Sequence, residues 1–299
     1  MCGIVAASAH RGITEILVSG LHTLEYRGYD SAGIALQTDK GLERQRTKGK
    51  VSDLEALLEE HPLKGRCGIA HTRWATHGVP NTENAHPHVS RGSVALVHNG
   101  IIENHDELRE ELTAAGYELD SETDTEVIAH AIEQRLKQGD PDLPTAFRKV
   151  LPSLRGIYAL VVLSADTPDV LVAARQGPPL VVGIGESEFF VASDIPAILM
   201  HTKDMVFMDD GEVVVVRSDG PSFMGLDGGK IEKEVTRVPW DPIMAEKGGY
   251  KHFMLKEIHE QPRAVRDTLL GRVSLESAKV MLDEMELSDE VLRSTERMC

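Results

Sequence analysis

The chain has 299 residues, with 48 Asp and Glu against 32 Lys and Arg, and a formal net charge of −16. A chain of this length can bury a sizeable core, either as one large domain or as one domain and part of another. Its 41% hydrophobic and 27% charged residues are typical of a globular protein and exclude wholesale disorder. The acidic balance argues against nucleic acid as the partner, because phosphate binding needs a basic face.

The three cysteines are far apart, at Cys2, Cys67 and Cys299, and their odd number excludes a disulfide framework. No apolar run approaches the roughly 20 residues that a membrane helix needs. The N-terminal MCGIVAASAHRG has no basic start and only a short apolar stretch, which is not typical of a secretory signal. We therefore expect a cytoplasmic protein without a membrane partner.

The first part of the chain is predicted to mix strands and helices. Apolar residues at helical spacing predict a helix from Ile13 to about Arg27, and Ser52 with Glu55 is interpreted as the capping box of a helix that stops before Pro62. The predicted strands are 2–8, the hairpin 32–38 and 42–47, then 67–72 and 94–98.

The middle of the chain is predicted to be helical and the following part to be made of strands. The predicted helices are 104–115, 123–138 and 143–154, and the predicted strands are 157–164, 170–174, 180–184, 189–193, 205–208 and 212–217. This grouping favours an α+β fold with two antiparallel sheets and helices outside them, rather than a doubly wound α/β fold.

Prolines and glycines in residues 239–249 (PWDPIMAEKGG) interrupt the pattern and are interpreted as a linker. Residues 250–299 have an amphipathic helical pattern but are too few for a robust core of their own. We expect one complete domain over 1–238, and a linker with the truncated start of a second domain over 239–299.

Cys2 is the first candidate catalytic residue. Removal of Met1 would make Cys2 the N-terminus, so that one residue carries both a thiol and an α-amine. The amine titrates at about 7.7–8.0 and the thiol at about 8.5, so the neutral amine can take the thiol proton and later return it to a leaving group. The alternative interpretation is a small buried cysteine in an edge strand.

The segment HTRWATHG gathers Arg73, Trp74, Thr76 and His77 after an apolar strand, where a turn is expected. The planar guanidinium of Arg73 suits a carboxylate, Thr76 and His77 add neutral donors, and Trp74 can cover a small substrate. The alternative is that Arg73 is a surface ion-pair partner.

Two further motifs have both a structural and a functional interpretation. Asn99-Gly100 is a common hairpin turn, but the Asn99 amide and the Gly100 N–H can also form an oxyanion hole for an attacked carbonyl. In SETDTE, Asp124 precedes a predicted helix, where it complements the helix dipole or binds a substrate ammonium group.

Cofactor and metal sites are not supported. His71, His77, His86 and His88 together with Cys2 suggest zinc, but their spacing is irregular and no CxxC or HExxH pattern is present. No dinucleotide fingerprint and no Walker A motif occurs. We expect no cofactor and no metal.

Six motifs in order carry a resemblance to a known family: MCGIV, EYRGYDSAG, HTRWATHG, NAHPH, HNGIIEN and SETDTE. Together they resemble the glutamine amidotransferase half of glucosamine-6-phosphate synthases, also called glutamine–fructose-6-phosphate aminotransferases (isomerizing). KEIHEQP, at 256–262, is similar to that family's linker. A cysteine start and an Asn-Gly pair also occur in amidophosphoribosyltransferases and asparagine synthetases, but EYRGYDSAG with HTRWATHG is similar to the aminosugar branch.

The resemblance implies the four-layer αββα sandwich of N-terminal-nucleophile hydrolases. It also implies a role for each matching residue: Cys2 as the nucleophile, Asn99 and Gly100 as the oxyanion hole, Arg73 for the glutamine α-carboxylate with Thr76 and His77 nearby, Asp124 for the α-ammonium, and Trp74 in a closing loop. His86 and Arg27 lie in family motifs without an assigned role.

The implied reaction is hydrolysis of the glutamine side-chain amide to glutamate and ammonia. In the family, ammonia then aminates fructose 6-phosphate to glucosamine 6-phosphate in a second half that would follow the linker. An amidophosphoribosyltransferase-like acceptor and a non-catalytic glutamine-binding module are the alternatives. A monomer and a homodimer both stay open at this point.

Overall fold

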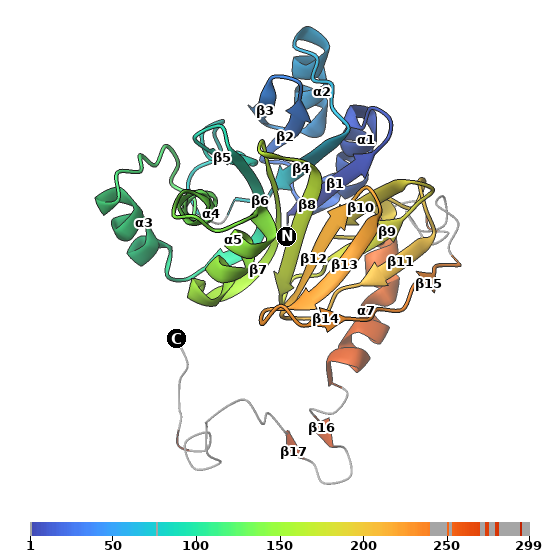
Figure 1. The fold of residues 1–299 in the computed structure, drawn as a ribbon. Coiled ribbons are helices and arrows are strands. Elements are labelled where there is room, and N and C mark those ends of the chain that lie inside the picture. Colours follow the sequence, from blue (N-terminus) through green and yellow to red (C-terminus); the bar gives the residue numbers. More distant parts are fainter. Residues whose placement is uncertain are drawn as a thin grey trace. The chain divides into compact units, whose positions relative to one another are not determined.

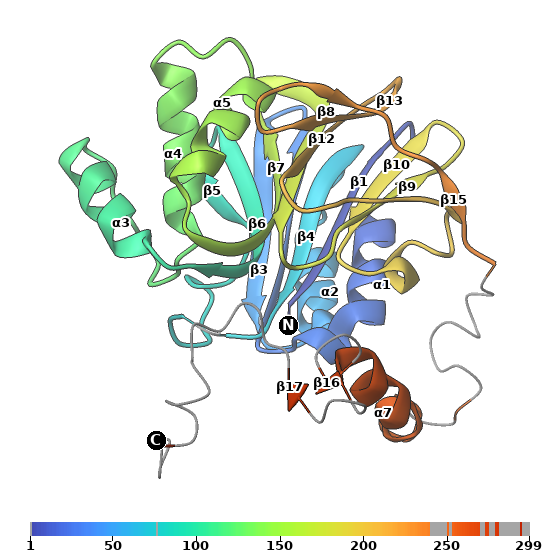
Figure 2. The same cartoon turned by 90° about the horizontal axis from the view of Figure 1, so that it is seen from below.

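The computed structural model describes residues 2–75, 77–239, 250, 253–269, 273–274, 279–280 and 294. Contacts divide the chain into two compact units, Met1–Pro242 and Ile243–Cys299. In the first unit, two antiparallel sheets lie between two layers of helices, as Figures 1 and 2 show.

The first sheet has eight strands in the order β15-β11-β9-β10-β1-β4-β2-β3. Its strands are β1 Gly3–Ala9, β2 Ser31–Thr38, β3 Gly41–Lys48, β4 Cys67–Arg73, β9 Val181–Ile184, β10 Glu188–Ala192, β11 Asp204–Phe207 and β15 Thr236–Arg237. The N-terminal strand β1 therefore lies inside the sheet, between β10 and β4.

The second sheet has seven strands in the order β14-β13-β12-β8-β7-β6-β5. They are β5 His88–Ser90, β6 Val94–Ile102, β7 Gly156–Ser164, β8 Thr167–Gln176, β12 Glu212–Arg217, β13 Gly220–Gly225 and β14 Lys230–Ile231. Most strands pair with a neighbour in sequence, which gives this sheet a meandering topology.

The helices form the outer layers, α1 and α2 on the first sheet and α4 and α5 on the second (Figure 2). The helical segments are α1 Thr14–Leu24, η1 Glu25–Arg27, α2 Val51–Glu60, α3 His105–Ala114, α4 Glu126–Lys137, α5 Leu143–Val150, η2 Leu151–Ser153 and η3 Ile195–Ala197. The predicted α+β, four-layer αββα architecture is confirmed.

Alternating side chains of each strand build two kinds of core. Ile4 and Ala6 of β1 face the second sheet and belong to the core between the sheets, with Val97 of β6. Val5 faces the helix side, where a Cβ at Gly20 of α1 would come within 2.9 Å of Val5 Cγ1. The close helix–strand approach thus requires glycine at position 20, and it anchors the strand that follows Cys2.

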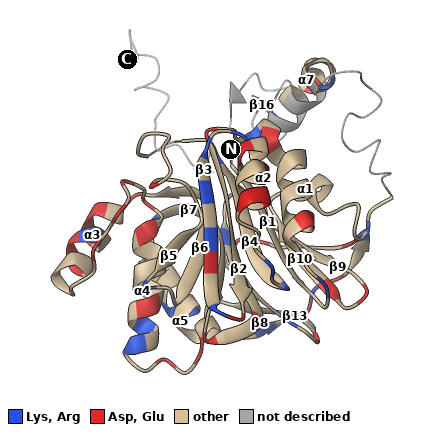
Figure 3. Ribbon diagram, turned by 90° about the horizontal axis from the view of Figure 1, so that it is seen from above, with Lys and Arg blue, Asp and Glu red and all other residues tan. Residues whose placement is uncertain are grey.

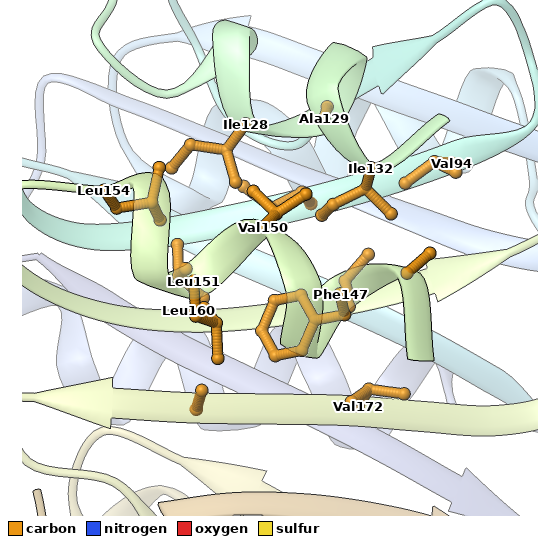
Figure 4. Close-up of a cluster of buried hydrophobic side chains, with 14 of the residues drawn as sticks. Val94, Ile128, Ala129, Ile132, Phe147, Val150, Leu151, Leu154, Leu160 and Val172 are labelled. Atoms are coloured by element: carbon orange, nitrogen blue, oxygen red, sulfur yellow. The ribbon is translucent and has the colours of Figure 1, made fainter. Parts of the chain in front are cut away.

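The second core lies between the second sheet and its helices (Figure 4). Phe147 of α5 is fully buried and lies among Ile132 of α4, Leu160 of β7 and Val172 of β8. The apolar spacing of α4 and α5 predicts this face. Burial of side chains of this size stabilises the fold by about 1.5–3 kcal/mol each, and it holds β6 and β7 in place.

Charged residues mark β3, which is one edge of the eight-stranded sheet (Figure 3). Its sequence GLERQRTK is nowhere buried, whereas β1 has no charged residue and lies in the interior. Charges on an edge strand disfavour pairing with another chain.

The predicted capping box of Ser52 and Glu55 is wrong. The residue that precedes the helix is Lys50 rather than Ser52, so α2 begins two residues earlier than predicted, at Val51. The carboxylate at its third position is therefore Asp53, which accepts the backbone N–H of Lys50 at 2.8 Å. A capping box depends on which residue comes first in the helix, and the sequence pattern placed that residue two positions too late.

The second unit contains helix α7, Phe253–Leu269, and the two paired short strands β16 Val273–Ser274 and β17 Lys279–Val280. The helical prediction for 250–299 is right for α7 and wrong for these two strands. The predicted linker lies outside the described residues, except for Pro239. No helix within the described ranges is long and apolar enough to cross a membrane.

Candidate active site

Cys2 lies directly ahead of β1, in the interior of the first sheet, so the edge-strand interpretation is wrong. Its sulfur accepts the backbone N–H of Trp74 at 3.1 Å. The next residue must be glycine, because a Cβ at position 3 would come within 2.6 Å of Thr72 Oγ1 and 2.8 Å of Leu24 Cβ. The absence of a side chain at Gly3 thus allows β1 to pack closely against β4 and α1, with the Cys2 thiol beside the end of β4.

Burial raises the pKa of the Cys2 thiol above its ordinary value. The N–H of Trp74 and the positive charges of Arg73 and Arg27 act in the opposite direction, because they stabilise a thiolate. A thiol in this setting needs a base to take its proton before it attacks a carbonyl.

Asn99 and Gly100 lie inside β6 of the second sheet, paired with Ala159 and Tyr158, and not in a hairpin turn. The predicted strand 94–98 is therefore too short. Asn99 Nδ2 donates a hydrogen bond to the Cys2 carbonyl oxygen at 3.0 Å. The two sheets thus bring the thiol residue and the candidate oxyanion donors together.

Gly100 has φ +144, and a Cβ at this position would lie 2.0 Å from the Ile157 carbonyl oxygen. Only glycine fits this conformation and this approach.

Arg73 ends β4 and is buried. Its guanidinium donates to the carbonyl oxygens of His77 and, at 3.2 Å, of Gly78. Burial lowers the pKa of Arg73, while the carboxylate of Asp124 acts to raise it. The side chain has hydrogen-bond partners in the following loop rather than a surface acidic partner, which argues against the ion-pair interpretation.

Asp124 lies two residues ahead of α4, and it is buried. Its Oδ2 accepts the backbone N–H of Ile102 at 2.8 Å and lies 3.9 Å from Nδ1 of His98. These contacts tie the carboxylate to the end of β6, beside the candidate oxyanion donors.

Trp74 and His77 have different positions relative to these groups. Trp74 is 47% exposed and makes an edge-to-face contact with Tyr29, with ring centroids 5.7 Å apart. The His77 ring packs against the ring of His105 at 5.3 Å. Thr76 lies outside the described residues.

A cavity of about 310 Å³ brings most of the predicted residues together. Its walls include six of them: Cys2, Arg73, Trp74, Asn99, Gly100 and Asp124. His77 is not part of the wall. One wall is cationic and another anionic, which matches the two charges of a free amino acid.

Arg27 also lines this cavity, although the sequence analysis assigned no role to it. Its buried guanidinium donates to Asp194 Oδ2 at 2.8 Å, and the Tyr26 hydroxyl donates to the same oxygen at 3.0 Å. Gly28 brings this segment against β4, because a Cβ there would lie 2.7 Å from the backbone carbon of Arg73. The sequence feature that could have indicated Arg27 as a cavity residue is its position directly before a glycine in EYRGYDSAG.

Histidines of the motifs form a buried stack beside the cavity. The rings of His71 and His86 are stacked at 4.3 Å, and those of His86 and His88 meet edge to face at 4.7 Å. Burial lowers the pKa of His71 to about 3 and holds the pKa values of His86 and His88 well below the ordinary value. They are neutral near pH 7. Within the described residues no group of three or more His, Cys, Asp or Glu is arranged to hold a metal ion.

This stack predicts acid sensitivity. In the unfolded chain each histidine binds a proton near pH 6.5, whereas in the folded chain it does not. The contribution of these histidines to the unfolding free energy is therefore fully present above that pH. As pH falls from about 6.5 toward the folded-state pKa, each histidine removes up to about 1.4 kcal/mol of unfolding free energy per pH unit. Urea unfolding at a series of pH values measures the slope. His71→Gln should reduce it by about that amount, whereas His61→Gln, an exposed position, should not; equal slopes would contradict the prediction.

Comparisons with known proteins identify the family of the chain. Residues 71–200 match the family described as glutamine amidotransferase domain. The chain is 48% identical to the glutamine–fructose-6-phosphate aminotransferase (isomerizing) of Caldanaerobacter subterraneus, over 100% of the chain and 48% of that protein. It is 52% identical to the enzyme of the same name from Pseudomonas putida, over 94% of the chain and 46% of that protein.

Among solved structures, the glutamine phosphoribosylpyrophosphate amidotransferase of B. subtilis is similar, with a TM-score of 0.65, 26% identity, and coverage of 75% of this chain and 49% of that chain. The chain spans about half the length of the curated relatives it matches. Fold, motifs and similarity agree, and the chain belongs to the glutamine amidotransferase domain family, in the form found in glutamine–fructose-6-phosphate aminotransferases.

Proposed function

We propose that the chain hydrolyses the side-chain amide of L-glutamine to glutamate and ammonia, with Cys2 as the nucleophile. The observation that carries this proposal is the convergence of the Cys2 thiol, Asn99, Gly100, Arg73 and Asp124 on one cavity.

Each step has a candidate group. After removal of Met1, the α-amine of Cys2 takes the thiol proton, and the sulfur attacks the amide carbon. Asn99 Nδ2–H and the Gly100 N–H stabilise the oxyanion of the tetrahedral intermediate. The ammonium returns its proton to the leaving nitrogen, ammonia departs, and water hydrolyses the glutamyl thioester to glutamate and free thiol.

The two charged walls would recognise the amino-acid end of glutamine. Arg73 binds the α-carboxylate as a planar fork, and Asp124 binds the α-ammonium. Trp74, half exposed beside the thiol, covers the bound substrate and excludes water.

We further propose that 1–238 is the glutaminase domain and that 239–299 is a linker with the start of a sugar-phosphate isomerase domain. In the longer, cytoplasmic protein, that second domain would use the ammonia to aminate fructose 6-phosphate to glucosamine 6-phosphate. The relatives that are 48% and 52% identical carry the name of that reaction, whereas the phosphoribosylpyrophosphate amidotransferase is 26% identical. This favours the aminosugar acceptor over the alternative one.

Assay of glutamate and ammonia from glutamine tests the proposal, and equimolar release is the expected result. Calorimetric binding of glutamine without turnover would instead support the binding-module alternative.

Asp124→Asn tests amino-acid recognition. The asparagine retains an oxygen for the Ile102 N–H but loses the charge, so kcat/KM for glutamine should fall about 10-fold to 100-fold. For glutaramate, which is glutamine without its α-ammonium group, the same change should alter kcat/KM by less than about threefold. Steady-state kinetics with both amides decides the matter: equal losses with the two substrates would mean that Asp124 acts on the fold and not on the ammonium group.

A further inference from the structure

His71 lies behind Asn99, between the two sheets, and it is fully buried. It is a residue of β4, paired with Ile4 of β1 and with Gly33 of β2. Its ring reaches across to β6, where Nε2 lies 3.1 Å from the His98 carbonyl oxygen and 3.0 Å from Asn99 Oδ1. One side chain of the nucleophile's sheet therefore contacts the candidate oxyanion residue of the other sheet.

The contacts of His71 fix the position of its proton. The His98 carbonyl oxygen only accepts, so the ring nitrogen that faces it must carry the hydrogen. Nδ1 is buried and has no hydrogen-bond partner within the described residues. Burial lowers the pKa of His71 to about 3, so the ring is neutral and has a single proton, on Nε2.

This proton in turn orients the amide of Asn99. With Oδ1 toward His71 Nε2–H, the amide nitrogen faces the Cys2 carbonyl oxygen, which accepts a hydrogen bond at 3.0 Å. The flipped amide would set N–H against N–H at one end and oxygen against oxygen at the other. The donor order thus runs from His71 through Asn99 to Cys2, and the second N–H of Nδ2 is left for an oxygen in the cavity.

We propose that His71 is a positioning residue that holds the Asn99 amide with its donor face toward the reacting carbonyl. This rests on the proposed function in so far as Asn99 serves as an oxyanion donor. His71 does not touch the substrate; it removes the amide orientation in which Asn99 would present oxygen to a developing negative charge.

Two substitutions of His71 separate this role from ring packing. Glutamine places an amide N–H close to the position of Nε2, whereas asparagine reaches only the position of Nδ1. Both lose the stacking on His86 at 4.3 Å, so they share that structural cost. We expect H71N to lower kcat about 10-fold to 100-fold with KM within about twofold, and H71Q to stay within about threefold of wild type in kcat. Equal losses in the two variants would overturn the proposal.

A double-mutant cycle tests whether the effect passes through Asn99. In an Asn99→Ala background, H71N and H71Q should have the same kcat, because no amide is left to orient. A further loss for H71N alone in that background would overturn the proposal.

Two-bond proton–nitrogen NMR correlations of the imidazole give a readout that needs no turnover. The expected spectrum of wild-type His71 is that of a neutral ring protonated on Nε2, and a ring protonated on Nδ1, or on both nitrogens, would overturn the assignment. If glutamine is not hydrolysed, the proposed function fails, while this spectrum still decides the orientation of the Asn99 amide.

Discussion

Cys2→Ala should abolish glutamate release, with a fall in kcat of about 10⁴-fold or more, because the covalent step has no other nucleophile. Alanine removes only the sulfur, and Gly3, where a Cβ would clash with Thr72 and Leu24, is unchanged. Quantification of glutamate after incubation with glutamine measures the effect.

Cys67→Ala is the matched control. Cys67 is a buried thiol of the first sheet, whereas Cys2 is partly exposed, and Cys67 pairs with Ser8 near the far end of β1. Burial raises the pKa of its thiol, so it is a poor nucleophile, and its loss should change kcat by less than about threefold. Undiminished activity in Cys2→Ala would refute the proposed mechanism.

The α-amine has its own test. A chain with one alanine inserted ahead of Cys2 retains the thiol but displaces the amine, so it should lose activity although the thiol can still be alkylated. N-terminal sequencing or mass spectrometry should find active protein that begins at Cys2. Full activity in protein that retains Met1 would contradict the role of the amine.

Gly100→Ala should have the second large effect, since its Cβ would lie 2.0 Å from the Ile157 carbonyl oxygen at φ +144. Relief of that overlap must separate β6 from β7, at a cost of about 3–5 kcal/mol of unfolding free energy. In protein that still folds, the displaced Gly100 N–H should lower kcat by about 100-fold. Urea unfolding and glutamate release measure the two effects.

Gly92→Ala controls for the backbone conformation alone. Gly92 also has a positive φ, +69, but a Cβ there would meet nothing within 4 Å. Its substitution should cost about 1–2 kcal/mol and leave kcat unchanged. Similar losses of stability and activity in the two variants would show that the overlap with Ile157 does not decide the outcome.

Local patterns in the sequence predicted most of the elements. The hairpin around Gly41, with φ +102, and the helices that end at Gly116 and Gly139, with φ +83 and +102, follow from chemistry that is visible in a few residues. β13 was missed because Gly-Pro at its start is typical of a turn. The pairing of Val5 with Ala192 is outside the reach of local patterns, since it joins opposite parts of the domain.

The candidate site was predictable as a set of residue types but not as an arrangement. Asn99-Gly100 resembles a hairpin turn to any local rule, and only the pairing of β6 with β7 shows that the pair lies within a strand. The cavity position of Arg27 depends on its contact with Asp194, which is remote in sequence. The position of the His71 proton depends on oxygens of β6 and could not be read from HTRWATHG.

The interior position of β1 also has a consequence for the order of folding. Strand β1, directly after Cys2, is synthesised before its two neighbours, β4 at Cys67–Arg73 and β10 at Glu188–Ala192. Contacts of such large sequence separation close late, because a long loop must be ordered before they form. During synthesis, β1 therefore has no pairing partner on its β10 side until most of the domain has been made. The proposed turnover of glutamine would then begin only after β10 has paired with β1 and completed the centre of the first sheet.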